Sequence, residues 1–171
     1  KVILQNIKVL AIGTTIEQVD DKPVEVPTVT LLVTPEDAER LTLAASSCGA
    51  AQACLEDAVA WARERKTFGQ PLIAHQVIRH KLVDMVARTE AARALVYDLA
   101  YRIERALGDT DDLVARACMA KVLATQAMQF CADQAVQMLG GMGFMRGTRS
   151  ERLYREVKVM MIGGGSEEIM K

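Results

Sequence analysis

Hydrophobic and polar positions follow two different periods along the chain. Residues 1–33 carry β-branched residues in short alternating runs, which indicates strands. A turn is expected at residues 13–15, and Pro23 and Pro27 indicate that the second run is either an edge strand or a strand that starts late. From Thr34 onward the apolar positions recur at every third or fourth residue, as they do in amphipathic helices. The sequence therefore predicts a short β segment followed by a helical region.

Helix signals divide the second region into an antiparallel bundle. Thr34 can cap the first helix, because Pro35 and then two acidic residues follow it. Glycine-containing breaks separate the helices that come after it. The predicted fold class is mainly α, a four-helix bundle behind a β segment, with domains at 1–33 and 34–171. The helices are expected at about 35–66, 74–107, 112–139 and 150–161, with a further one starting at Ser166.

Two of these helices carry a clear buried seam. In each, apolar or small residues are spaced alternately by three and four positions, which is typical of helices packed lengthwise on partners. Small residues in the later seam would let helix axes approach closely. The earlier seam contains Ile78, Leu82, Met85, Thr89, Ala92, Val96, Leu99 and Ile103, and the later one Leu113, Ala117, Ala120, Ala124, Ala127 and Cys131.

Composition narrows the classes of function. Half of the residues are hydrophobic, a quarter are charged, and the net charge is −1, so neither a nucleic acid nor an anionic membrane is an expected partner. The four cysteines lack the paired spacing of a zinc site, so no metal is expected and the thiols indicate small buried residues of a reducing, cytoplasmic compartment. No signal peptide or membrane span is evident, and a start at Lys1 indicates a fragment, a processed product or an excised domain.

Four stretches together resemble one enzyme family. They read ARERKTFGQP at 62–71, AHQ at 74–76, QMLGGMGF at 137–144, and LYREVK followed by IGGGSEEI at 153–169. In this order and at these separations they are similar to the helical C-terminal domain of flavin-dependent acyl-CoA dehydrogenases, over about residues 39–171. Each stretch alone is a weak signal, and their combination is specific.

The resemblance implies an activity and its partners. A carboxylate would remove the α proton of an acyl-CoA thioester while the β hydrogen leaves as hydride to FAD. An electron-transfer flavoprotein or a similar acceptor would then take the electrons. The resemblance also implies a homo-oligomer whose other domains complete the cleft, so we expect that this polypeptide by itself does not oxidise acyl-CoA.

The same resemblance assigns the cofactor contacts. A guanidinium and a hydroxyl at 65 and 67 suit the flavin pyrophosphate across a subunit interface, and the glycines after Gln137 suit a close approach of the adenosine half. Taken alone, the charges at 63–66 indicate a solvated helix end, a lone histidine is more often structural, and the glycines stop a helix. Phe68, Met138, Leu139 and Phe144 are expected in the core. The implied cofactor residues are Arg65, Thr67, His75, Gln76, Gln137, Gly140, Gly141, Ser166 and Glu168.

The position of the base departs from the commonest family pattern. Many members carry the catalytic glutamate where this chain has Gly164, and a glycine cannot take a proton. An isovaleryl- and long-chain-type branch places the glutamate on the first long helix, in a pattern resembling AERLTLA at 38–44. Glu39 is therefore the candidate base and Arg40 the candidate contact to CoA. The alternative is an ordinary exposed glutamate in a first helical turn.

Residues 1–44 resemble a different family, the Flp-type pilus assembly proteins. The two resemblances overlap at residues 39–44, as expected of a chimera with a splice near that point. Two alternatives to an enzyme domain therefore remain open. One is a non-enzymatic chimeric helical bundle, and the other is a pilus-assembly component that acts through its N-terminal segment.

Overall fold

The computed structural model describes residues 12–19, 22–29 and 34–171. Strand β1 (Ile12–Val19) pairs antiparallel with β2 (Lys22–Val29) in a two-stranded sheet. The turn expected at residues 13–15 is wrong, because β1 continues through it and its two β-branched threonines favour an extended backbone. Both prolines lie in β2, where each strand of a two-stranded sheet is an edge. The strands expected at 1–10 and 30–33 lie outside the described residues.

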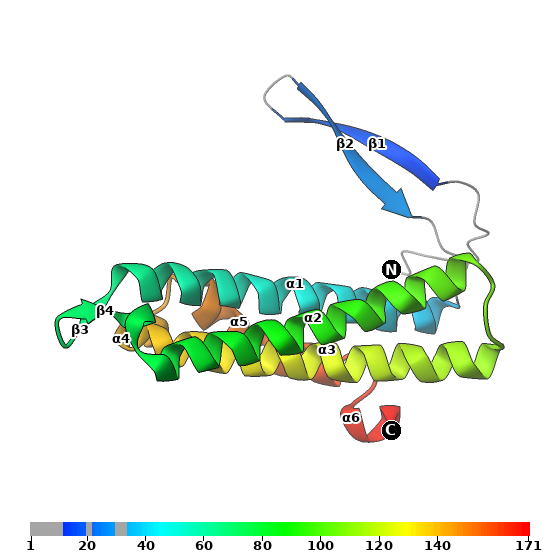
Figure 1. Ribbon diagram of the computed structural model, residues 1–171. Coiled ribbons are helices and arrows are strands. Elements are labelled where there is room, and N and C mark those ends of the chain that lie inside the picture. The colour runs from blue at the N-terminus through cyan, green and yellow to red at the C-terminus, as the bar shows by residue number, and fades with distance from the viewer. Residues whose placement is uncertain (1–11, 20–21, 30–33) are drawn as a thin grey trace.

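Four helices form a bundle, which confirms the predicted fold class (Figure 1). They are α1 (Pro35–Glu64), α2 (Gln76–Glu104), α3 (Thr110–Leu139) and α5 (Arg149–Ile162). Helix α3 contacts the other three, and α1 contacts both α2 and α5. Within the described part of the chain, no helix has an apolar stretch long enough to cross a membrane.

Short elements connect the long helices. Strands β3 (Lys66–Thr67) and β4 (Gln70–Pro71) form a small hairpin, which the 3₁₀ turn η1 (Leu72–Ala74) joins to α2. Helix α4 (Gly141–Phe144) lies between α3 and α5, and α6 (Glu167–Met170) follows α5. In Figure 1 the β3–β4 hairpin and α4 lie at the same end of the bundle, away from α6.

Side-chain caps fix several helix starts. The Thr34 hydroxyl accepts a hydrogen bond from the Asp37 amide at 3.2 Å, so the predicted start of α1 is confirmed. Thr148 caps α5 in the same way. Ser166 immediately precedes α6, which confirms the predicted helix start, although its hydroxyl accepts no capping bond.

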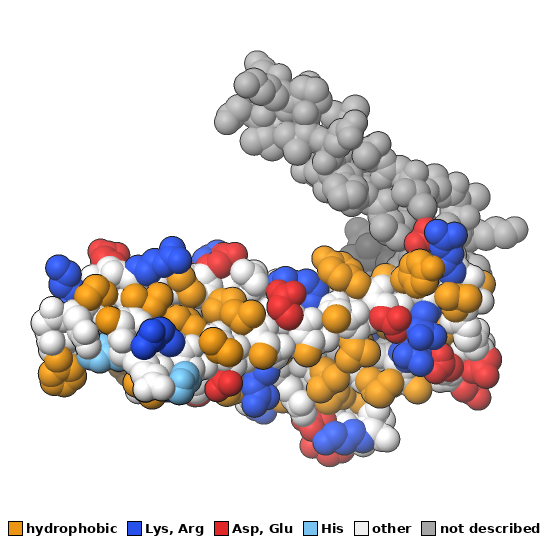
Figure 2. All heavy atoms as spheres, in the orientation of Figure 1, with side chains coloured by type: hydrophobic (Ala, Val, Ile, Leu, Met, Phe, Trp, Pro, Cys, Tyr) orange, Lys and Arg blue, Asp and Glu red, His pale blue; other side chains and the backbone are white. Residues whose placement is uncertain are grey.

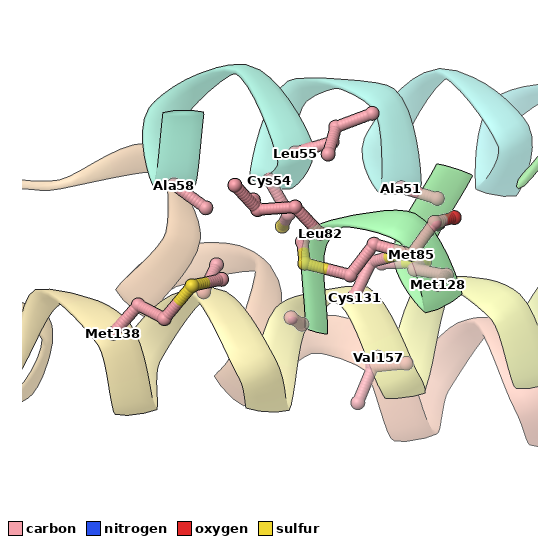
Figure 3. Close-up of a cluster of buried hydrophobic side chains, with 12 residues drawn as sticks. Ala51, Cys54, Leu55, Ala58, Leu82, Met85, Met128, Cys131, Met138 and Val157 are labelled. Carbon is pink, nitrogen blue, oxygen red and sulfur yellow. Dashed lines mark hydrogen bonds between the residues drawn. The ribbon is translucent and has the colours of Figure 1, made fainter. Parts of the chain in front are cut away.

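The core follows the predicted seams. Six of the eight positions in the α2 seam are buried, and its two outermost residues are partly exposed. In the α3 seam the five positions after Leu113 are buried, while Leu113 itself is half-buried. Of the cysteines, only Cys118 is partly exposed. Figure 3 shows the larger cluster, where α1, α2, α3 and α5 contribute Ala51, Cys54, Leu55, Ala58, Leu82, Met85, Met128, Cys131, Met138 and Val157.

Two aromatic residues expected in the core are on the surface. Phe68 is 98% exposed and Phe144 is 87% exposed, whereas Met138 and Leu139 are buried as predicted. Phe68 occupies the turn of the β3–β4 hairpin with a φ of 50°, and Phe144 ends α4. Both therefore belong to turns at one end of the bundle, where neighbouring helices cannot cover them.

Candidate functional site

Glu39 and Gly164, far apart in the sequence, lie together in the structure. Glu39 is exposed near the start of α1, and Gly164 belongs to the turn between α5 and α6. A Cβ on Gly164 would stand 3.4 Å from Glu39 Oε1 and 2.8 Å from Leu43 Cδ1. The glycine also has a φ of +68°, which other residues adopt at a cost. A side chain at Gly164 would thus project toward Leu43 and the carboxylate of Glu39.

Arg40, the candidate contact to CoA, is turned toward the start of its own helix. Its Nη1 donates to Asp37 Oδ1 at 2.8 Å, and the side chain is half-buried. The Arg40 Nε is buried and has no hydrogen-bond partner among the described residues. Asp37 therefore holds one nitrogen of the guanidinium, and the buried Nε faces the protein interior.

Lys121 of α3 is a buried cation beside this turn. The residue is 1% exposed, and its Nζ donates to the carbonyl oxygens of Met161 at 2.6 Å and Gly165 at 2.5 Å. Burial lowers the pKa of Lys121, and the negative charges of neighbours that include Glu167 and Glu39 oppose that effect. The residue is therefore both a hydrogen-bond donor to the turn and a charge near the candidate base.

Sequence reasoning missed Lys121, although a signal was present. It lies four residues after Ala117 and three before Ala124, in the register of the buried seam of α3. A lysine at such a position must either reach out to solvent or find acceptors inside the protein. Its acceptors are main-chain carbonyls far along the chain, which no local pattern can reveal.

The acidic residues of α6 are held in their charged form. Lys171 and Gln126 donate to Glu167 Oε1 at 2.6 and 2.8 Å, and these bonds lower the pKa of Glu167. A backbone amide and the Ser166 hydroxyl lower the pKa of Glu168, which is exposed. The Ser166 hydroxyl thus interacts with the Glu168 carboxylate and does not cap the backbone of α6.

At the other end of the bundle, Thr67 and His75 brace the β3–β4 hairpin. Thr67 Oγ1 lies 3.0 Å from His75 Nε2, and Gln70 Nε2 lies 3.3 Å from His75 Nδ1. Both ring nitrogens of His75 are therefore engaged inside the turn, as the structural interpretation of a lone histidine expected. Phe68 meets the ring of His75 edge-on, with 6.2 Å between centroids.

The same end presents an exposed guanidinium and an open backbone. Arg65 follows α1 directly, is exposed, and forms no salt bridge among the described residues. Gly140 ends α3 with a φ of +60°, and neither it nor Gly141 has an atom within 4 Å of an added Cβ. Gln76 and Gln137 are exposed nearby on α2 and α3.

The predicted site residues therefore form two groups. Glu39 and Arg65 are separated by most of α1, roughly 39 Å at the helical rise per residue. One chain does not bring all nine predicted cofactor residues together, because Ser166 and Glu168 lie on the Glu39 side (Figure 1). The remaining members, on the Arg65 side, are Thr67, His75, Gln76, Gln137, Gly140 and Gly141.

Two family models match the chain. The C-terminal domain of acyl-CoA dehydrogenases matches residues 32–171, and the Flp pilus assembly protein RcpC/CpaB matches residues 1–51. The matches overlap at residues 32–51, a stretch that includes Glu39. The overlap is wider than the sequence pattern indicated, and it lies where α1 begins.

Individual proteins give the same result. An acyl-CoA dehydrogenase of Bacillus subtilis is 43% identical over 132 residues, which is 77% of this chain and 34% of that protein. A mitochondrial isovaleryl-CoA dehydrogenase of Oryza sativa is 38% identical over 79% of this chain and 32% of its own length. The structure of a putative acyl-CoA dehydrogenase from Mycobacterium smegmatis superposes with a TM-score of 0.75 and 37% identity, covering 87% of this chain and 41% of that one. The chain spans about a third of the curated relatives that it matches.

Proposed function

Because the chain belongs to the acyl-CoA dehydrogenase family through its C-terminal helical domain, we propose that it forms one wall of an acyl-CoA cleft and supplies the base. The reaction is α,β-dehydrogenation of an acyl-CoA thioester in a flavin-dependent enzyme. The position of the Glu39 carboxylate against Gly164 carries this proposal.

Glu39 suits the removal of a proton from substrate. Its carboxylate is exposed on the bundle surface, and it meets the glycine turn at the position where many relatives carry their base. A carboxylate enclosed by a thioester and a flavin loses hydration, which makes it a stronger base. Arg40, one residue further along, is proposed to contact the CoA portion of the substrate.

The residues around Arg65 fit a dinucleotide cofactor. An exposed guanidinium can bind pyrophosphate oxygens in a fork, and the open backbone at Gly140 and Gly141 lets a ligand approach closely. The exposed ring of Phe68 offers an apolar face next to them. When bound there and in the cleft, FAD supplies the uptake of hydride from the acyl chain.

We propose that the two ends of the bundle serve two different cofactor molecules. A separation of roughly 39 Å along α1 is too long for both ends to hold one dinucleotide. The Arg65 end would then bind the pyrophosphate of the FAD in a neighbouring copy, while the Glu39 end faces the substrate and flavin of its own subunit. The functional unit is therefore a homo-oligomer.

An exposed apolar face supports such an assembly. A groove of about 320 Å³ runs between α1 and α2, and every residue that lines it is apolar. Figure 2 shows hydrophobic side chains along this face, between scattered charged ones. Such surfaces on a bundle normally pack against a partner. The lining residues are Leu55, Val59, Leu82, Val83, Val86 and Ala87.

Other features of the whole enzyme follow from the family. Acyl-CoA is the proposed substrate, and an electron-transfer flavoprotein or a similar acceptor is the proposed electron partner. We also propose a division of the chain into a β segment at 1–33 and the bundle at 34–171. The match of residues 1–51 to a pilus assembly protein supports a chimeric origin and favours, as the second candidate, a bundle without enzymatic activity.

Replacement of Glu39 tests the proposed reaction. In the flavin-loaded enzyme that contains these residues, we expect Glu39→Gln to lower turnover of acyl-CoA by about 10²- to 10⁴-fold, the usual contribution of a general base. Flavin content should stay the same. Glu36→Gln changes an exposed acid three residues earlier in α1 and is the matched control, which should keep full activity. Wild-type turnover in Glu39→Gln would exclude Glu39 as the base.

The flavin content of the purified 171-residue chain tests whether one chain alone holds a complete cofactor site. Each chain supplies only part of each cofactor site, so we expect the purified chain to hold no stoichiometric FAD, as judged by visible absorbance. If the chain instead binds one FAD per molecule, the division of the site between copies and other domains is wrong. A chimeric bundle without function predicts no FAD even in the assembled enzyme.

A further inference from the structure

Lys121 is the largest fully buried side chain among the described residues. An ammonium group removed from water is costly unless acceptors replace its hydration. Here the acceptors are the carbonyl oxygens of Met161 and Gly165, and no carboxylate lies within salt-bridge distance of its Nζ among the described residues. The buried ammonium group of Lys121 therefore binds two backbone carbonyls, one at the end of α5 and one in the turn that follows it.

The two carbonyls frame the end of α5. A helix leaves its last four carbonyls without partners inside the helix. The Gly163 amide donates to Val159 O at 2.8 Å, and the Gly165 amide donates to Ile162 O at 3.2 Å. Lys121 donates a hydrogen bond to Met161 O. Its positive charge is also favourable near the C-terminus of α5, where the helix dipole is negative.

The turn held in this way contains Gly164. Its neighbour Gly165 gives its carbonyl to Lys121, and Gly164 itself lies against the carboxylate of Glu39. Two glycines with positive φ make this turn soft in the absence of an external contact. Lys121 therefore holds the turn whose Gly164 faces the candidate base, with Glu39 Oε1 3.4 Å from where a Cβ of that glycine would be.

We propose that Lys121 is a positioning residue for proton abstraction, which fixes the glycine turn against which the Glu39 carboxylate rests. This inference rests on the proposed function, since it assigns to Lys121 the geometry of that base. The side chain does not need to touch substrate. Its role is to hold the turn within the small tolerance that proton transfer requires.

Lys121→Met is the principal variant. Methionine has a similar length, tolerates irregular buried space and keeps the apolar register of α3, so the bundle should still fold. Lys81→Met is the matched control. Lys81 of α2 donates a single hydrogen bond to Gln134 of α3 at 2.7 Å, and it lies away from the glycine turn. Lys121→Gln, which keeps a donor, serves as the conservative variant.

Three measurements on the flavin-loaded enzyme distinguish positioning from simple structural support. We expect kcat per bound flavin to fall by about 10²-fold in Lys121→Met, the scale of a 1 Å misplacement, with little change in KM. The isotope effect with acyl-CoA deuterated at the α carbon should increase, because proton abstraction becomes the slow step. Amide hydrogen exchange should accelerate at residues 163–171 and stay unchanged elsewhere. Lys121→Gln should recover part of each effect.

Each outcome bears on one proposal. Normal kcat per flavin and a normal isotope effect in Lys121→Met would overturn the positioning role, even if less folded protein is obtained. If Lys121→Met does not fold, normal values of both quantities in Lys121→Gln would overturn the role instead. Full activity of Glu39→Gln refutes the assignment of the base separately, and accelerated exchange at 163–171 still establishes that Lys121 holds the turn.

Discussion

The Glu39 carboxylate occupies the space above Gly164, with its Oε1 3.4 Å from where a Cβ of that glycine would be. One residue comes from near the start of α1 and the other from the turn after α5. By the family resemblance, each position corresponds to the base of one branch. Under the proposed function, a carboxylate could therefore reach the same region of the cleft from α1 or from the turn after α5.

This geometry predicts that the base can be relocated. In a Glu39→Gly, Gly164→Glu double variant, a carboxylate at 164 would start from a Cβ next to the position that the original carboxylate leaves. We expect the double variant to recover a measurable part of the turnover that Glu39→Gly loses. A non-glycine residue at φ +68° costs roughly 1–2 kcal/mol, so the thermal stability should fall. The measurement is kcat per bound flavin for both single variants and the double variant.

The control for relocation is Glu39→Gly, Gly164→Gln, which has the same bulk and no carboxylate. Activity of this control equal to that of the glutamate variant would mean that the recovery is steric. No recovery in a folded, flavin-loaded glutamate variant would contradict the shared position of the two carboxylates.

Arg65 should determine how tightly flavin is held. Loss of a charge-assisted hydrogen bond to phosphate costs about 1.5–3 kcal/mol, so we expect Arg65→Gln to retain FAD about 10- to 100-fold less well. Turnover per bound flavin should not change, because Arg65 lies far from Glu39 along α1. Flavin retained after dialysis measures the effect. Arg63→Gln, exposed in the same helix end, is the control, and equal losses in both variants would indicate a general charge effect.

Gly143 should not tolerate a side chain. A Cβ there would stand 2.4 Å from Val136 O and 2.9 Å from Val136 Cα, both backbone atoms of α3. We expect Gly143→Ala to destabilise the fold by about 1–3 kcal/mol, as overpacking does. Gly141→Ala in the same short helix meets no atom within 4 Å and should be neutral or slightly stabilising. Urea unfolding measures the free energy of unfolding of both variants, and equal values would refute the close packing of α4 on α3.

Glu151 should make stability depend on acid pH. The residue is 7% exposed, and the hydrogen bond and charge of Arg155 hold the pKa of its carboxylate below the ordinary value. The unfolded chain therefore binds the proton first, and the contribution of Glu151 is complete above about pH 4.3 and disappears as pH falls through the folded value. Unfolding free energies of Glu151→Gln should thus decline less steeply in acid than those of the wild type. Arg155→Met removes the cause of the lowered pKa and should also make the unfolding free energy decline less steeply in acid. If both variants keep the pH dependence of the wild type, Glu151 is not its source.

Much of the bundle could be predicted because its packing follows a regular period. The seam of α2 identified its six buried residues, and proline and hydroxyl signals placed the start of α1 correctly. Such signals are local, so the sequence alone carries them. The turns were predicted less well: Phe68 and Phe144 are hydrophobic but have no neighbouring helix to cover them, and the β-branched residues at 14 and 15 continue a strand.

The candidate site depended on information of another kind. Motifs of the family identified Glu39 and Gly164, but only the fold shows that the Glu39 carboxylate faces Gly164. Lys121 was missed because its acceptors are backbone carbonyls, which have no sequence signature. The cofactor role predicted for His75 stays a prediction, and the fold adds that both of its ring nitrogens contact Thr67 and Gln70. The residue pattern does not reveal contacts between a side chain and backbone groups far away in the sequence.

The length of α1 has a genetic consequence. If each copy lends its Arg65 end to the site of a neighbour, a subunit damaged at Glu39 still completes its neighbour's cofactor site, and a subunit damaged at Arg65 still carries its own base. Mixed assemblies of the two defective subunits then contain some sites built wholly from intact ends. Two inactive alleles of this protein would therefore complement each other, whereas two alleles damaged at the same end would not.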